Sequence, residues 1–140
     1  MKKSGQKKTR VAVFGIFDGV HDGHRDFFLQ AREYGDELVV IVGRDEIAEK
    51  LKGRKPKYSQ DERRAMLKKE PLVDDVVLGD LDLSTYTVLV GCNPDVVCLG
   101  YDQGELAEDL EKWIQKTQAR ITIHRAKAYR KDTLHNSLFL

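Results

Sequence analysis

The sequence predicts a single Rossmann-like α/β domain, in which a doubly wound, parallel, five-stranded sheet carries helices on both faces. Consecutive apolar residues recur at 11–14, 38–42, 76–78 and 96–99. Because these runs do not alternate with polar residues, each is expected to be a strand that is covered on both faces, as in parallel sheets. Helical patterns separate the runs, which fits right-handed crossovers between parallel strands. The length of 140 residues suits one domain, since domains usually have about 100–200 residues.

The expected order of elements is β-α-β-α-α-β-α-β-α-β. Residues 24–34 place apolar side chains on one side of a helix, and a shorter helix is expected at 45–51. Ser59 and Glu62 form a capping box that opens a helix reaching about residue 69. A β-branched helix is expected at 85–92, and apolar spacing that includes Trp113 predicts a helix over 106–117. Residues 120–124 alternate, which predicts a half-exposed edge strand.

The charge is unevenly distributed along the chain. The formal net charge is +1, from 24 basic and 23 acidic residues. Five of those basic residues and no acidic residue lie in residues 1–10. We therefore expect a flexible basic tail at 1–9 and a mildly acidic domain over 10–140. This distribution argues against a strongly basic nucleic-acid-binding domain, and nucleic-acid binding through the tail remains a weak alternative.

Other classes of protein are disfavoured by what the chain contains. The longest apolar run, 38–42, is far shorter than the about 20 residues of a transmembrane helix. The basic start leads into a strand-like segment and does not resemble a signal peptide. Two cysteines, Cys92 and Cys98, are too few for a disulfide scaffold and are expected to be buried and inert. We therefore expect a cytoplasmic protein.

Residues 15–24 carry the chemistry, as Gly-Ile-Phe-Asp-Gly-Val-His-Asp-Gly-His between the first strand and the first helix. Ligands of doubly wound sheets bind beyond the carboxyl ends of the strands. A helix that begins at about His24 directs its free N–H groups and its dipole there, so an anion is expected. His21 and His24 could donate to phosphate oxygens, and a phosphate would favour their charged form. Ordinary loop histidines are the alternative.

Other phosphate and metal motifs are missing from the sequence. It contains neither a P-loop nor a dinucleotide-binding glycine fingerprint. Zinc needs three or four ligands, and the two histidines supply two, so no metal site is expected.

The phrase at 15–24 resembles the Gly-x-Phe-Asp-x-x-His-x-Gly-His signature of the cytidylyltransferase-like nucleotidyltransferases, the HxGH superfamily. The resemblance runs from about residue 10 to residue 137. Within that family, the phrases at 50–56, 62–64 and 99–103 are most similar to archaeal-type FAD synthases. Glycerol-3-phosphate cytidylyltransferases share the same skeleton but match these phrases less closely.

The resemblance implies roles for individual residues. The backbone after the first strand would line the nucleotide, the two histidines would bind the triphosphate, and a residue after the fourth strand would hold the nucleoside. The residues implied in catalysis are His21, His24, Lys55 and Arg63. The residues implied in nucleotide binding are Ile16, Phe17, His21, Asp22, Gly23, His24, Asp102, Tyr129 and Ser137.

The C-terminal phrase departs from the family pattern. The family ends in a Ser/Thr-rich phrase and a lysine that grips the triphosphate. Here Asn136 stands where a serine is usual and Leu138 stands in place of the lysine. Arg130, Lys131 or His135 could supply the charge instead. The resemblance therefore implies either a rewired phosphate site or a weakened activity.

Three further features have more than one interpretation. The Lys-rich segment 50–57 is either a mobile basic flap over the triphosphate or a solvated basic loop. Asp102 is either a nucleoside ligand or a turn residue. The acidic residues Asp74, Asp75, Asp80 and Asp82 lack the spacing of an EF-hand and favour a solvated acidic edge over a calcium site.

The resemblance implies nucleotidyl transfer, in which a phosphate oxygen of an acceptor attacks the α-phosphorus of a nucleoside triphosphate. The implied reaction is FMN adenylylation, which forms FAD and pyrophosphate from ATP. Cytidylyl transfer from CTP to glycerol 3-phosphate or a related polyol phosphate is the alternative within the same class. A non-catalytic nucleotide- or flavin-binding module is the alternative of another class. The resemblance also implies a divalent cation, Mg²⁺, bound through the triphosphate, and allows a homodimer.

Overall fold

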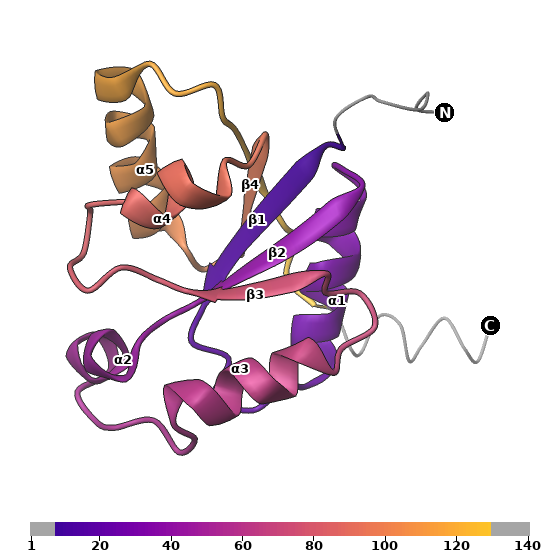
Figure 1. The fold of residues 1–140 in the computed structure, drawn as a ribbon, viewed down its shortest axis with the longest axis vertical. Helices are drawn as coiled ribbons and strands as arrows, with labels where there is room; N and C mark the ends of the chain where they lie inside the picture. Colours follow the sequence, from indigo (N-terminus) through magenta and orange to yellow (C-terminus); the bar gives the residue numbers. More distant parts are fainter. Residues whose placement is uncertain (1–7, 130–140) are drawn as a thin grey trace.

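The structure is a computed structural model that describes residues 8–129 (Figure 1). Five strands form one sheet in the order β3-β2-β1-β4-β5, and every neighbouring pair is parallel. The strands are β1 (Arg10–Gly15), β2 (Glu37–Val42), β3 (Asp75–Leu78), β4 (Val96–Leu99) and β5 (Thr122–Arg125). The helices are α1 (Asp22–Arg32), α2 (Asp45–Lys52), α3 (Gln60–Lys68), α4 (Thr87–Cys92) and α5 (Gly104–Thr117). The predicted fold class and the predicted order of elements are confirmed.

Two hydrophobic cores lie on opposite faces of the sheet. On one face, Phe28 of α1 and Leu67 of α3 pack with alternate residues of the strands. On the other face, Leu89 of α4 and Leu110 of α5 pack with the remaining strand residues. In Figure 1, α4 and α5 accordingly lie on one side of the sheet and α1 and α3 on the other. The central strands are buried on both faces, which explains their continuous apolar runs.

The direction of winding reverses beside β1. The chain passes from β1 to β2 and β3 on one side, and α4 then returns it to β4 on the other side of β1. The carboxyl ends of β1 and β4 therefore meet at a topological switch point, where ligands of such sheets bind. The pairing of β1 with β2 continues to Gly15 and Val42, whereas the β1–β4 pairs run only over Val11–Val96 and Ala12–Val97.

Three helix starts differ from the sequence prediction, and one of them is that of α5, which begins at Gly104 and not at residue 106. α1 begins at Asp22, two residues before the predicted start, because His21 is its N-cap. α4 begins at Thr87 and not at residue 85, because Tyr86 takes a left-handed backbone with φ of 52°. The capping box predicted for Ser59 and Glu62 is confirmed at the start of α3.

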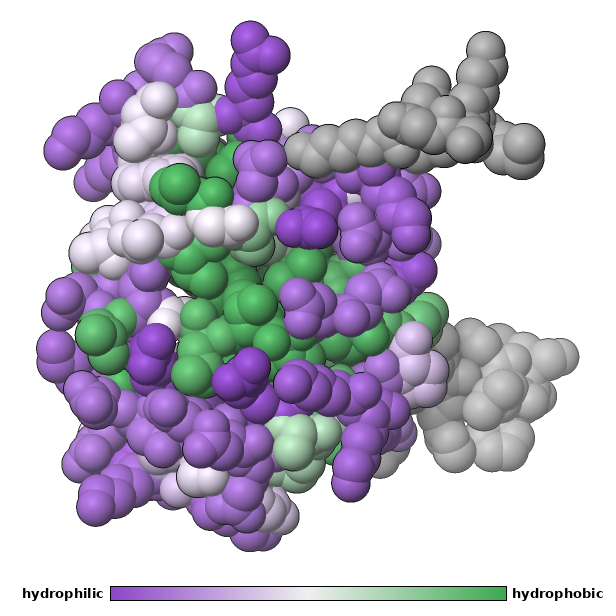
Figure 2. All heavy atoms as spheres, viewed as in Figure 1, coloured by the Kyte–Doolittle hydropathy of each residue, from purple (hydrophilic) through white to green (hydrophobic). Residues whose placement is uncertain are grey.

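The surface is polar over most of the view in Figure 2, with hydrophobic side chains gathered in the middle of this face. That hydrophobic area lies between α4 on one side and α2 and α3 on the other (Figures 1 and 2). Within residues 8–129, none of the helices has the length and apolar character needed to cross a membrane.

Candidate active site

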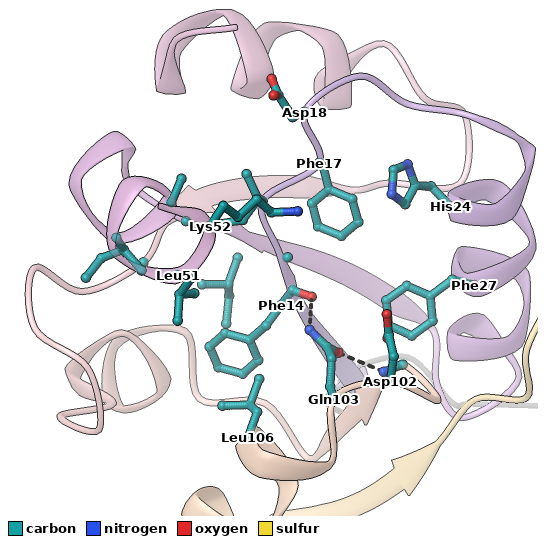
Figure 3. A pocket seen from close by; sticks show the side chains of 18 of the residues that line it. Phe14, Phe17, Asp18, His24, Phe27, Leu51, Lys52, Asp102, Gln103 and Leu106 are labelled. Carbon is teal, nitrogen blue, oxygen red and sulfur yellow. Dashed lines mark hydrogen bonds between the residues drawn. The ribbon is translucent and has the colours of Figure 1, made fainter. Parts of the chain in front are cut away.

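A cavity of about 1640 Å³ opens at the switch point, above the carboxyl ends of β1 and β4 (Figure 3). Its walls come from the segment after β1, the N-terminus of α1, α2 with the segment that follows it, residues 79–86, and the start of α5. Nine sequence-predicted site residues line it: Ile16, Phe17, His21, Asp22, Gly23, His24, Lys55, Asp102 and Tyr129. Segments that are distant in sequence therefore bring most of the predicted site to one place.

Both histidines help to form the first turn of α1. His21 Nδ1 accepts a hydrogen bond from the Gly23 amide at 3.1 Å, and His24 Nδ1 accepts one from the His21 amide at 3.3 Å. The two rings are stacked with their centroids 3.8 Å apart. Since each Nδ1 accepts, each neutral ring carries its proton on Nε2, the nitrogen that is then able to donate. The local geometry thus fixes the tautomer of both histidines.

His24 is a weak base in the free protein. Burial is the main cause that lowers its pKa from 6.5 to about 4, and the neighbouring His21 and Arg25 act in the same direction. His24 is therefore a neutral hydrogen-bond donor at physiological pH. The charged form expected from the sequence would require the negative charge of a bound phosphate.

Phe17 supports His24 from inside the molecule. Its backbone is left-handed, with φ of 53°, which turns the side chain inward. The ring is almost fully buried and meets His24 edge to face, with centroids 5.0 Å apart. A Cβ at Gly15 would lie 2.6 Å from the same ring, so only glycine fits there. The segment after β1 is therefore shaped to hold one histidine in place.

Arg63 lies elsewhere than the sequence resemblance implied. Its side chain is fully buried and is not part of the cavity wall. The guanidinium donates to the carbonyl oxygens of Ile16, Gly43 and Tyr58 at 2.7–3.0 Å. It also forms an ion pair with Asp45 at 2.7 Å. Arg63 therefore ties three segments together beneath the cavity and does not itself line it.

Basic side chains from α2 and the segment after it line the wall of the cavity that faces His24. Lys52 and Lys55 both line it, and Figure 3 shows the Lys52 ammonium group directed toward Phe17. Lys50 and Lys52 belong to α2, so the helix takes up part of the basic segment that the sequence suggested as a flap. The positive charge expected at the site is therefore present on its helical wall as well as in the following segment.

Asp18 anchors the basic segment, a role that the sequence analysis did not assign. Its carboxylate accepts hydrogen bonds from the Lys57 amide at 2.7 Å and the Tyr58 amide at 2.8 Å. Desolvation acts to raise the pKa of Asp18, but these two hydrogen bonds, together with the positive charges of Arg63 and Lys52, hold the pKa below its usual value. The motif at 15–24 thus anchors the end of the segment that carries Lys55.

Gln103 joins the ends of β1 and β4. Its side-chain oxygen accepts from the Gly100 amide at 2.7 Å, and its amide group donates to the Phe14 carbonyl at 3.1 Å (Figure 3). Asp102 lies in the same turn and lines the cavity, so its two interpretations are compatible. Tyr129 lies near the N-terminus of α1, since a Cβ at Gly23 would be 3.8 Å from its ring. Ser137 and the rest of the C-terminal phrase lie outside the described residues.

The acidic residues that the sequence predicted to be a solvated edge are only partly solvated, since several of them make specific contacts. Asp80 and Asp82 line the cavity, and Asp80 accepts from the Val88 amide in the first turn of α4. Asp74 forms an ion pair with Arg32 at 2.6 Å. Among residues 8–129, no group of three His, Cys, Asp or Glu side chains is placed to hold a metal ion. These carboxylates therefore organise the backbone and the cavity rim.

Comparison with known proteins identifies relatives of the whole domain. A family model described as "Cytidylyltransferase-like" matches residues 12–134. A protein named FAD synthase from Thermococcus sibiricus is 39% identical over 133 residues, which is 94% of this chain and 90% of that protein. The FAD synthase of Pyrococcus horikoshii is also 39% identical, over 94% of this chain and 89% of its own. A solved structure, the lipopolysaccharide core biosynthesis protein from Thermoplasma volcanium, is similar with a TM-score of 0.82 and 31% identity, over 89% of this chain and 100% of that one.

Proposed function

Because the chain belongs to the cytidylyltransferase-like family, we propose that it is an FAD synthase that transfers AMP from ATP to the phosphate of FMN. Membership of the family confirms the resemblance that residues 15–24 suggested. The choice of FMN and ATP is supported by the relatives named FAD synthase, which the chain matches over most of their length. The observation that carries the proposal is the histidine pair at the N-terminus of α1, inside a cavity that also holds lysines.

The reaction forms one bond and breaks one. A phosphate oxygen of FMN attacks the α-phosphorus of ATP, and the bond from that phosphorus to the pyrophosphate oxygen breaks. The electron pair leaves with pyrophosphate. The FMN phosphate is already ionised at neutral pH, so no strong general base is needed. Catalysis then consists of positioning the reactants and stabilising the charge that builds up on the phosphate oxygens.

The described residues suit that task. The Nε2–H groups of His21 and His24 would donate to phosphate oxygens at the N-terminus of α1, whose dipole favours an anion. Lys52 and Lys55 would add positive charge from the facing wall. Asp102 and Tyr129, which follow β4 and β5, would contact the nucleoside. Arg63 would act through the segments that it ties together.

Mg²⁺ would be carried mainly by the nucleotide. Mg²⁺ commonly binds through phosphates and waters with one or two carboxylates, and does not need a cage of protein ligands. Asp80 and Asp82 line the cavity, so one or two carboxylates are available for that mode. When bound, the ion would neutralise charge on the triphosphate.

The test is product formation with four substrate pairs. ATP or CTP is combined with FMN or glycerol 3-phosphate, and pyrophosphate and the nucleotide product are both measured. We expect FAD and pyrophosphate from ATP with FMN, and little product from the other pairs. Product from CTP with glycerol 3-phosphate would instead support a cytidylyltransferase. Absence of product from every pair, with FMN or ATP still bound, would support a binding module.

A further inference from the structure

The cavity has two chemically different parts. One part contains the α1 N-terminus and the lysines. The other, here called the apolar lobe, is formed by Phe14, Ile47, Leu51, Leu83, Tyr86 and Leu106. Figure 3 shows Phe14, Leu51 and Leu106 together, on the far side of Lys52 from His24. The lobe opens into the same space as the phosphate-binding part, so one ligand can reach both.

The apolar lobe contains unusually exposed leucines. Leu51 is 60% exposed and Leu83 is 52% exposed, although both line a cavity. Exposed apolar surface grouped at a cavity indicates a binding site for an apolar ligand surface. The cavity volume of about 1640 Å³ also exceeds the roughly 300–1,000 Å³ of common single-ligand sites. The structure therefore has room for a second substrate beside a nucleotide.

The wall of the lobe is fixed in an uncommon backbone conformation. Ser84 and Tyr86 have φ of 67° and 52°, in the left-handed region. The Tyr86 hydroxyl donates to the Asp109 carboxylate on α5. Burial, followed by this hydrogen bond, raises the pKa of Tyr86, so the hydroxyl stays protonated. Such backbone strain persists only where the surroundings hold it, and it is typical of functional sites.

Aromatic rings continue inward from that wall. The rings of Phe14 and Tyr86 meet edge to face with centroids 6.3 Å apart, and Tyr86 packs on Trp113 at 5.5 Å. Aromatic and aliphatic walls of this kind suit a flat aromatic ring. A polyol phosphate has no apolar part and would leave the exposed leucines in water.

We propose that the apolar lobe binds the isoalloxazine ring of the flavin acceptor, with the Tyr86–Asp109 hydrogen bond holding its wall. This proposal rests on the proposed function, since it takes FMN as the acceptor. The triphosphate would occupy the α1 end of the cavity and the nucleoside would lie near Asp102 and Tyr129. The apolar lobe is the part of the cavity that those groups leave for the acceptor.

Two leucines of one segment provide a matched test. Leu81 and Leu83 are two residues apart and are similarly exposed, but Leu83 lines the cavity and Leu81 does not. We expect Leu83→Asp to raise the KM for FMN at least about tenfold, because a carboxylate cannot replace apolar contact with the ring. The KM for ATP should stay unchanged. Leu81→Asp should leave both values unchanged.

The outcomes separate the two proposals. If the wild-type protein forms no FAD from ATP and FMN, the proposed function fails, and this inference fails with it. If the wild-type protein forms FAD but Leu83→Asp leaves the KM for FMN unchanged, the lobe assignment alone is overturned. A rise in the KM for ATP instead would place the adenine in the lobe and would also overturn it.

A second pair covers the case in which Leu83→Asp does not fold. Leu51→Asp changes another exposed leucine of the lobe, and Leu29→Asp changes an exposed leucine of α1 outside the cavity. Quenching of FMN fluorescence then measures flavin binding directly. Weaker FMN binding by Leu51→Asp, with unchanged binding by Leu29→Asp, supports the proposal. Equal binding by both variants overturns it.

Discussion

His21 and His24 cap the same helix reciprocally: each ring nitrogen Nδ1 accepts a backbone amide of the first turn, and the rings stack 3.8 Å apart. Side-chain caps are usually formed by Ser, Thr, Asp or Asn. An imidazole in this position leaves a second nitrogen that can donate to a ligand. The residues that cap the N-terminus of α1 can therefore also bind the substrate.

Removal of His24 should affect turnover far more than folding. We expect His24→Ala to lower kcat about 10²–10³-fold, by analogy with the loss of an oxyanion-hole donor. Loss of its capping hydrogen bond should cost only about 1 kcal/mol of stability. FAD formation and chemical denaturation measure the two effects. His124→Ala is the control, since His124 stacks on Tyr34 on the surface of the domain and does not line the cavity. A near-wild-type rate for His24→Ala would remove His24 from the mechanism.

His24 should also make stability depend on pH. In the unfolded chain His24 gains a proton as the pH falls through 6.5, but in the folded protein only near pH 4. The unfolded state therefore binds more protons between these values, and the free energy of unfolding falls as the pH is lowered through that window. Denaturation at pH 7.5 and pH 5 should show a larger loss for the wild type than for His24→Gln. Equal losses would contradict the low pKa.

Arg63 should be essential to stability. Arg63→Met leaves three carbonyl oxygens and the Asp45 carboxylate without their donor. Asp45 is 43% exposed and can be solvated, so the main loss comes from the carbonyl oxygens, at about 1–3 kcal/mol for each buried acceptor left without a donor, which chemical denaturation would detect. The matched control is Arg64→Met on the same helix, where Nε has no hydrogen-bond partner among the described residues. That change should stay within about 0.5 kcal/mol. Similar losses for both variants would show that the buried network is not the cause.

Asp18 should act on nucleotide binding through the basic segment. Asp18→Asn keeps one carbonyl oxygen for two amides, so one of the bonds to Lys57 and Tyr58 is lost. A lost hydrogen bond to a charged acceptor costs about 1.5–3 kcal/mol, so the KM for ATP should rise at least about tenfold. Faster trypsin cleavage after Arg54 or Lys57 is the independent measurement, since Pro56 protects the bond after Lys55. Glu111→Gln, an exposed change on α5, is the control. Unchanged cleavage would mean that Asp18 does not anchor the segment.

The order of elements could be read from the sequence because buried parallel strands require unbroken apolar runs, as at 38–42. The start of α4 could not, because no local pattern predicts the left-handed backbone of Tyr86, whose hydroxyl donates to Asp109, 23 residues away. The buried position of Arg63 could not be predicted from the sequence for a similar reason. Its partners are mostly backbone carbonyls, which any residue type supplies. The apolar lobe has no motif either, since its residues come from four separate segments of the chain.

Gln103 stands where the hydrogen-bond ladder between β1 and β4 has stopped. The backbone pairs of these strands end at Ala12 and Val97, and the side-chain amide of Gln103 then spans from the Phe14 carbonyl to the Gly100 amide. This side-chain bridge is longer than a direct backbone hydrogen bond between two strands. It keeps the ends of β1 and β4 apart by a fixed distance. The width of the crevice at its base thus depends on the length of one side chain. Asparagine is one methylene shorter, so a chain that carried it there would have to draw the strands together or give up one of the two bonds.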